Sequence, residues 1–130
     1  MSKTPIVSIV DDDESVREAT KGLVRSLGYS AATFASAEEF LSSDHLSETS
    51  CLIADVQMPG LNGPDLQHYL VTQGHCIPII FVTAYPEERI RARVLKAGAI
   101  DFLSKPFSEE SLIGCLDTAL SDNHVEGIAR

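Results

Sequence analysis

Short apolar runs alternate with longer stretches of helical periodicity along the whole chain, and this alternation restricts the fold more than any other feature. Four runs, at residues 6–10, 51–54, 77–82 and 99–103, are bounded by Pro, Gly or Asp, which is typical of strands buried on both faces. A weaker run at 30–34 completes the set. Strict strand–helix alternation requires right-handed crossovers, and hence a parallel sheet with helices on both faces.

The stretches between the runs carry helix signals. In the first, apolar residues recur at three-to-four spacing up to Gly28, and Asp13 is placed to cap its start. The second is short, and Ser36 with Glu39 predicts a capping box at its opening. Further helices are predicted around 66–70, 86–97 and 108–120. The predicted fold class is therefore α/β, a flavodoxin-like doubly wound sheet of five parallel strands in the order 2-1-3-4-5, with five helices.

A chain of 130 residues is about the size at which one domain closes one core. Apolar periodicity fades near residue 122, so we predict a domain at 1–122 and a tail, or the start of a linker, at 123–130. The scattered cysteines Cys51, Cys76 and Cys115 stand in apolar surroundings and predict buried free thiols rather than a disulfide framework.

The charge and hydropathy of the chain exclude several function classes. A net charge of -9 argues against direct nucleic-acid binding, because such binding depends on clustered Lys and Arg. No apolar stretch approaches the length needed to span a bilayer, and the first residues lack the apolar region of a signal peptide. We therefore expect a cytoplasmic protein that has no membrane partner.

Polar residues suited to chemistry follow the predicted strands. Asp11 and Asp12 come after the first strand, Asp55 after the third, Thr83 after the fourth and Lys105 after the fifth. Ligand sites in such sheets lie beyond the carboxyl ends of the strands. The three carboxylates are expected to crowd into one pocket, where their like charges disfavour full ionisation without a cation.

The donor atoms in this pocket indicate the kind of cation. They are all oxygens, which favours Mg²⁺, or Mn²⁺, over zinc. Mg²⁺ held by few carboxylates completes its shell with water and phosphate oxygens, so the pocket suits a phosphoryl group. Lys105 and Thr83 can contact phosphoryl oxygens, an arrangement that favours carboxylate attack on phosphorus.

Four segments carry a resemblance to a known family. They are VDDDE at 10–14, DVQMPG at 55–60, VTA at 82–84 and KPF at 105–107. In order and spacing they resemble the signature segments of the receiver domains of two-component response regulators. The resemblance covers roughly residues 5 to 120, and the segments at 36–41 and 96–99 resemble the FixJ branch of the FixJ/NarL class.

The resemblance implies a role for each acidic residue. Asp55 is implied as the phosphoacceptor, and Asp12 and Asp55 as direct ligands of Mg²⁺. Asp11 is implied to act on the metal through water, and the main-chain carbonyl of Gln57 to complete the protein ligands.

The resemblance also implies a switch. Lys105, which a cis peptide before Pro106 would aim, is implied to hold one phosphoryl oxygen. Thr83 would move to hydrogen-bond another oxygen, and Phe102 would turn inward to fill the space that Thr83 leaves. Gln57 and Tyr85 occupy the positions that tune the lifetime of the phosphorylated state.

The implied protein is a signalling module, not an enzyme with a separate product, since it would catalyse only its own phosphorylation and slow dephosphorylation. A sensor histidine kinase is implied as its donor. The fourth helix and fifth strand are implied to form the switched face, through which two copies would dimerise on phosphorylation. The FixJ-like segments and the aperiodic tail suggest that the natural chain continues into a helix-turn-helix DNA-binding output domain that controls transcription.

Other readings remain open at this point. Asp11 and Asp13 also resemble the nucleophile and acid of haloacid-dehalogenase-type phosphatases, and a register error of one residue would exchange Asp12 and Asp13. A flavin carrier of the same fold would need a phosphate-cradling loop where this chain has carboxylates. Two further alternatives are a docking module that is never phosphorylated and a stand-alone receiver that has no output domain of its own.

Overall fold

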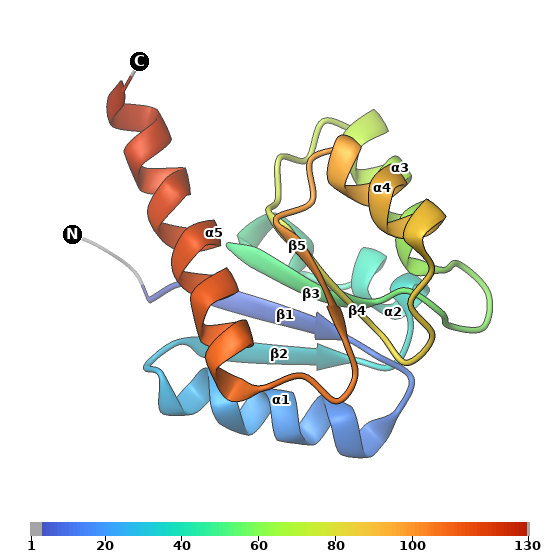
Figure 1. Ribbon diagram of the computed structural model, residues 1–130. Coiled ribbons are helices and arrows are strands. Elements are labelled where there is room, and N and C mark those ends of the chain that lie inside the picture. The colour runs from blue at the N-terminus through green and yellow to red at the C-terminus, as the bar shows by residue number, and fades with distance from the viewer. Residues whose placement is uncertain (1–3, 130) are drawn as a thin grey trace.

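Five parallel strands form the sheet of the computed structural model, in the order β2-β1-β3-β4-β5 (Figure 1). The structure describes residues 4–129, and side chains as far as Ser121. The strands are β1 (Ile6–Val10), β2 (Ser30–Phe34), β3 (Cys51–Asp55), β4 (Ile79–Thr83) and β5 (Asp101–Ser104). Every neighbouring pair is parallel, so the predicted fold class and strand order are confirmed.

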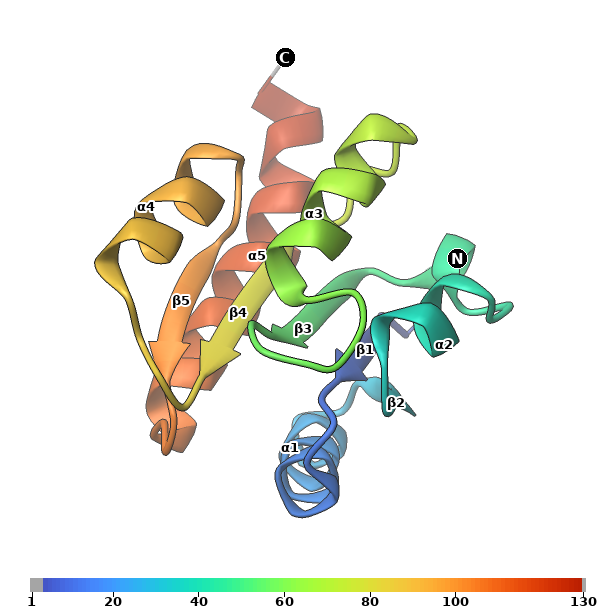
Figure 2. The ribbon, with the colours of Figure 1, turned by 90° about the vertical axis from the view of Figure 1, so that its right-hand side faces the viewer.

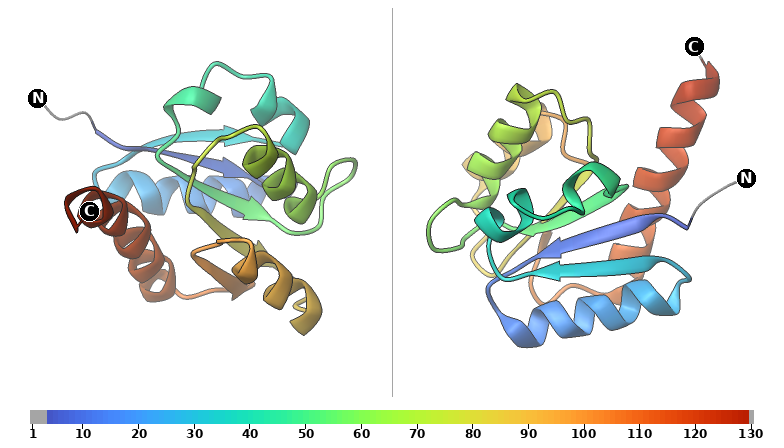
Figure 3. Two further views of the ribbon diagram at one scale, coloured as in Figure 1. Left: turned by 90° about the horizontal axis from the view of Figure 1, so that it is seen from above. Right: turned by 180° about the vertical axis from the view of Figure 1, so that it is seen from behind.

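The helices form two layers, one on each face of the sheet (Figures 2 and 3). Their bounds are α1 (Glu14–Ser26), α2 (Ala37–Leu41), α3 (Gly63–Thr72), α4 (Glu88–Lys96) and α5 (Glu109–Ala129), with a short 3₁₀ turn at Leu46–Glu48. Buried side chains of α1 and α5 share one hydrophobic cluster, and those of α2, α3 and α4 share the other. The sheet is thus covered on both sides.

The inner strands supply both clusters by strict alternation. In β3, Cys51 and Ile53 face the α1–α5 layer, whereas Leu52 and Ala54 face the α2–α4 layer. A strand covered on both faces needs apolar residues at every position, which explains why the apolar runs of the sequence are unbroken. Cys51 and Cys115 are buried as predicted, but the prediction for Cys76 is wrong, because it lies exposed in the loop before β4.

Strand ends differ from the predicted runs by a residue or two. β5 begins at Asp101 rather than at residue 99, because the amide of Ala99 bonds to the carbonyl of Val94 and closes the end of α4. β3 extends by one residue, because Asp55 still pairs with Val82 of β4. Asp55 therefore ends its strand instead of following it.

The predicted caps are found with one change. Asp13 accepts hydrogen bonds from the amides of Ser15 and Val16 at the start of α1. Ser36 accepts the amide of Glu39 at 3.1 Å, but Glu39 Oε1 bonds to the amide of Ala35 instead of returning to Ser36. The second hydrogen bond of the capping box of α2 therefore involves the amide of Ala35, one residue before the expected amide of Ser36.

α5 continues to Ala129, through the residues for which a tail was predicted. Among its described side chains, Leu112, Leu116 and Ala119 are buried against the sheet. In the part of the chain that the structure describes, no helix is long and apolar enough to cross a membrane.

Candidate functional site

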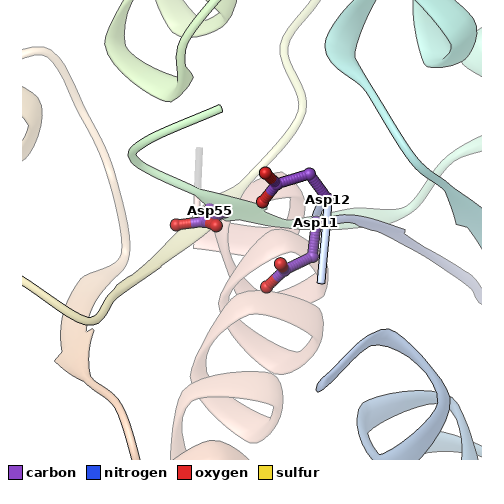
Figure 4. A group of neighbouring side chains, drawn as sticks. All are labelled: Asp11, Asp12 and Asp55. Atoms are coloured by element: carbon purple, nitrogen blue, oxygen red, sulfur yellow. The ribbon is translucent and has the colours of Figure 1, made fainter. Parts of the chain in front are cut away.

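The carboxyl ends of the strands bring three carboxylates together. Asp11 follows β1 directly, Asp12 comes next, and Asp55 ends β3. One carboxylate oxygen from each lies within 4.8 Å of the other two, and Figure 4 shows the side chains of Asp11 and Asp12 directed toward Asp55. Asp11 is 1% and Asp55 5% exposed, whereas Asp12 lies open to solvent. The predicted acidic pocket is therefore present and mostly buried.

In the turn after β1, the acidic residues Asp11 and Asp13 make different hydrogen bonds. Asp11 Oδ1 accepts the amide of Asp13 at 2.9 Å, and Arg17 Nη1 donates to the main-chain carbonyl of Asp11 at 2.7 Å. The side chain of Asp13 is occupied in capping α1, outside the carboxylate group. The register question between Asp12 and Asp13 is thus settled in favour of Asp12 as the member of the pocket.

Lys105 lies in the same pocket, directly after β5. Its Nζ is 2.9 Å from Asp11 Oδ2 and 3.3 Å from Asp55 Oδ2, and its side chain is 15% exposed. The contact with Asp11 is an ion pair without the direction of a hydrogen bond, so Asp11 Oδ2 has no hydrogen-bond donor among the described residues. One ammonium cannot balance three carboxylates.

The pKa values of the pocket reflect this imbalance. Burial, and then the negative charge of Asp11, raise the pKa of Asp55 to about 6, although Lys105 and the amide of Gln57 act in the opposite direction. Burial alone would lower the pKa of Lys105, but its ion pair with Asp11 and the charge of Asp55 outweigh burial, and the pKa is raised. Near neutral pH the Lys105 ammonium thus lies beside an Asp55 carboxylate that is mostly ionised, in a pocket partly shielded from water.

These features fit a hard divalent cation. All donors are oxygens, Asp11 Oδ2 is a buried acceptor without a hydrogen bond, and burial together with the charge of Asp11 raises the pKa of Asp55. A Mg²⁺ ion would relieve each of these costs. The amide of Gln57 donates to Asp55 Oδ1 at 3.2 Å, which puts the start of the β3–α3 loop beside the site. The ligand roles of the four residues, including the Gln57 carbonyl, stay predictions.

The residues of the predicted switch lie around β4 and β5. Thr83 ends β4, is fully buried, and accepts the amide of Tyr85 with its Oγ1 at 3.0 Å. Phe102 is only 9% exposed and packs in the cluster beneath α4. Phe102 is thus already inward while the hydroxyl of Thr83 is still bonded to Tyr85, and the coupling of the two movements stays a prediction.

The remaining predicted site residues lie at the rim. Tyr85 is 70% exposed, and Gln57 is exposed beside the pocket, so both can meet water or a partner near Asp55. The peptide between Lys105 and Pro106 is cis, as the resemblance implied.

Sequence reasoning missed two features near the site. One is Glu38, whose Oε2 accepts the amide of Leu61 in the β3–α3 loop at 2.9 Å. The other is a groove of about 500 Å³ beside Lys105, lined by α1 residues such as Val16 and Leu23 and by Pro106 and Phe107. Neither has a local sequence signal, because each joins segments that are distant along the chain.

Comparison with known proteins identifies what this arrangement resembles. The family description "Response regulator receiver domain" matches residues 7–117. The response regulator protein TodT of Pseudomonas putida is 43% identical over 118 residues, which cover 91% of this chain and 52% of TodT. The transcriptional regulatory protein FixJ of Bradyrhizobium diazoefficiens is 31% identical, over 88% of this chain and 56% of FixJ.

A solved structure agrees with these matches. The response regulator StyR superimposes with a TM-score of 0.88 at 41% identity, covering 98% of this chain and 65% of that one. The predicted likeness to FixJ-type regulators is confirmed by the match to FixJ. The chain spans about half the length of the curated relatives it matches.

Proposed function

The chain belongs to the response regulator receiver family and has FixJ/NarL-type relatives, and from this premise we propose that Asp55 accepts a phosphoryl group from a sensor histidine kinase. The observation that carries the proposal is the setting of Asp55. Its carboxylate is nearly buried at the end of β3, with Lys105 Nζ 3.3 Å away and two further carboxylates beside it. This set of groups supports a metal-assisted transfer to a carboxylate oxygen.

The transfer needs an ionised Asp55. With a pKa of about 6 the carboxylate is largely deprotonated near neutral pH, so one oxygen can attack phosphorus. The new O–P bond forms as the P–N bond of the donor phosphohistidine breaks, and the released imidazole takes a proton from water. Lys105 holds its ammonium against the site, where it can pair with a phosphoryl oxygen as charge accumulates.

The proposed metal is Mg²⁺, or Mn²⁺, held by Asp11, Asp12, Asp55 and the main-chain carbonyl of Gln57. When bound, such an ion neutralises charge on the transferring phosphoryl group. Asp11 and Lys105 are already paired at 2.9 Å, which places the ammonium beside the carboxylates before a donor arrives. We propose Gln57 and Tyr85, at the rim, as the residues that set how quickly water removes the phosphoryl group.

The proposed output is an altered surface and not a chemical product. Phosphorylation replaces the single negative charge of Asp55 by a phosphoryl group that carries nearly two, a change that can bias a two-state element nearby. Thr83 and Phe102 connect the pocket to α4 and β5, because one ends β4 and the other packs beneath α4. We propose that this face controls the output and brings two copies together. The module in this view catalyses only its own phosphorylation and slow dephosphorylation.

The proposed output is control of transcription. Relatives about twice the length of this chain include proteins named as transcriptional regulators, which supports a DNA-binding helix-turn-helix domain beyond this segment. The receiver itself, with a net charge of -9, is not proposed to bind nucleic acid. We propose the cytoplasm as the compartment, because kinase and gene control would both act there.

Intact-mass spectrometry after incubation with acetyl phosphate tests the proposal. Wild type should gain the mass of one phosphoryl group only when Mg²⁺ is present. Asp55→Asn should gain nothing, and Asp117→Asn, which removes an exposed carboxylate of α5, should behave as wild type. A wild type that stays unmodified would favour a docking module. Labelling that survives loss of Asp55 would point to Asp11 as the nucleophile, as in the phosphatase alternative.

A further inference from the structure

The loop between β3 and α3 begins one residue after Asp55, and its two ends are fixed by main-chain bonds. The amide of Val56 donates to the carbonyl of Val82 at 2.9 Å, and the amide of Gly63 returns to the carbonyl of Val56 at 2.9 Å. Between these points the loop carries Gln57, whose carbonyl is a proposed ligand. Figure 2 shows the loop, drawn in green around the β3 label, arching toward α2.

Glu38, in the first turn of α2, bonds to the outer part of this loop. Its Oε2 accepts the amide of Leu61 at 2.9 Å, across 23 positions of sequence. Among the hydrogen bonds of the described residues, it is the only one that joins residues 58–61 to another element. The hydrogen bond to Leu61 also holds the pKa of Glu38 below its usual range, so the carboxylate stays charged.

The fit of the loop against this carboxylate is close. Gly60 has a φ of +77°, and a Cβ at this position would lie 2.7 Å from Glu38 Oε2. A residue with a side chain would be strained in this conformation and would displace the carboxylate. The turn at Gly60 thus suits a chain in which Glu38 lies directly against the loop backbone.

The neighbouring Glu39 has a different partner. Its Oε1 accepts the amide of Ala35, four positions away, and its own amide bonds to Ser36. Glu39 therefore stabilises the start of α2 locally, whereas Glu38 connects α2 to a separate segment. The two adjacent glutamates form a matched pair for experiment.

We propose that Glu38 is a positioning residue for the phosphorylation site, acting through the loop that carries Gln57. The proposal rests on the proposed function in one respect, namely that the Gln57 carbonyl binds the metal. Gln57 is held at its amide by Asp55, but the direction of its carbonyl depends on the peptide that continues into residues 58–61. Releasing Leu61 from Glu38 frees that part of the loop. Met58 and Leu61 still pack against the core, so a weakened site is expected and not a lost one.

Two measurements on metal-free protein test this: amide hydrogen exchange at Gln57 and Leu61, and Mg²⁺ affinity by titration calorimetry. In Glu38→Ala, exchange should accelerate at both amides, and the dissociation constant for Mg²⁺ should rise by about three- to tenfold, the scale of one lost hydrogen bond. Glu38→Gln keeps an acceptor oxygen and should stay within about twofold of wild type. Glu39→Ala should accelerate exchange in α2 while leaving the Mg²⁺ affinity unchanged.

Two results would overturn the proposal. They are a wild-type Mg²⁺ affinity in Glu38→Ala, whether or not amide exchange is faster, and an equal loss of affinity in Glu39→Ala. Failure of the proposed function looks different, because it appears as wild-type protein that binds no Mg²⁺ or takes no phosphoryl group from acetyl phosphate. Rescue by Glu38→Gln separates a missing acceptor from general damage to α2, and supports the positioning role.

Discussion

Replacing Asp55 by Asn is expected to stabilise the metal-free protein near neutral pH, although it removes the proposed phosphoacceptor. Burial and the charge of Asp11 raise the pKa of Asp55 from 3.8 to about 6, so the folded state resists ionisation of this carboxyl. Wild type is then most stable, with respect to this group, below pH 3.8. It loses that stability as the pH rises through about 6, because the unfolded chain ionises freely.

The size of the effect follows from the shift. Two pKa units correspond to roughly 3 kcal/mol. That figure is an upper bound, because Asn also gives up the ion pair with Lys105 at 3.3 Å and because the pocket is open on the side of Asp12. With a discount for solvent screening, a net gain of about 1–2 kcal/mol is expected in Asp55→Asn above about pH 7. Most of this gain should vanish near pH 4, where Asp55 is protonated in the folded wild type.

Urea unfolding in the presence of a chelator, at about pH 7.5 and about pH 4.5, measures this directly. Asp117→Asn controls for the loss of one negative charge at an exposed position of α5. Adding Mg²⁺ should stabilise wild type more than Asp55→Asn. The difference in free energy of unfolding between the two proteins should therefore narrow or reverse. Equal stability of the two proteins at the higher pH would refute the reasoning. An equal gain at both pH values would refute it too, since the gain could not then come from ionisation.

Three further substitutions have expected outcomes in urea unfolding. Gly63→Ala puts a Cβ 2.6 Å from the carbonyl oxygen of Asp55 and should cost about 1–3 kcal/mol; a wild-type midpoint would show that the backbone can move aside. Gln67→Ala removes the bond from Nε2 to the Val94 carbonyl at 3.0 Å and should cost about 1–3 kcal/mol, with faster amide exchange in α4 but not in α5; uniform exchange would contradict it. Lys105→Met leaves two buried carboxylates unpaired and should cost roughly 1–3 kcal/mol in chelator, much of it recovered with Mg²⁺. No recovery would argue against a cation in this pocket.

The sequence predicts the sheet well because burial on both faces leaves a strong local signal. Unbroken apolar runs, with charged or small residues at their ends, were enough to place all five strands and their order. Strand ends were less predictable, since they depend on where each amide bonds. The amide of Ala99 looks like part of a strand in the sequence, but it bonds to the end of α4.

The site was predictable to the extent that strand ends determine it. Asp11, Asp55 and Lys105 meet because parallel strands end at one edge of the sheet. The bond between Glu38 and Leu61 could not be predicted in this way, because an exposed glutamate on a short helix has many possible partners. The position of Phe102 was equally open, since an aromatic side chain on an edge strand can turn toward the core or away from it.

The way each helix is held supports the proposal that phosphorylation of Asp55 acts on α4. α1 begins with a capped turn and bonds to the carbonyl of Asp11, directly after β1. In contrast, α4 follows an exposed loop, and the side chain of Glu87, just before it, makes no capping bond. Val94 is the one buried residue of α4, and Gln67 of α3 bonds to the carbonyl of Val94 near the other end of the helix.

Thr83 lies at the start of the loop between β4 and α4 and accepts the amide of Tyr85. A phosphoryl group that draws the hydroxyl of Thr83 toward Asp55 would free this amide at the weakly held end. Elements with few buried contacts move or unfold locally at a low cost in free energy. We therefore expect α4 to pivot about its contact with Gln67 while the sheet and α1 keep their places.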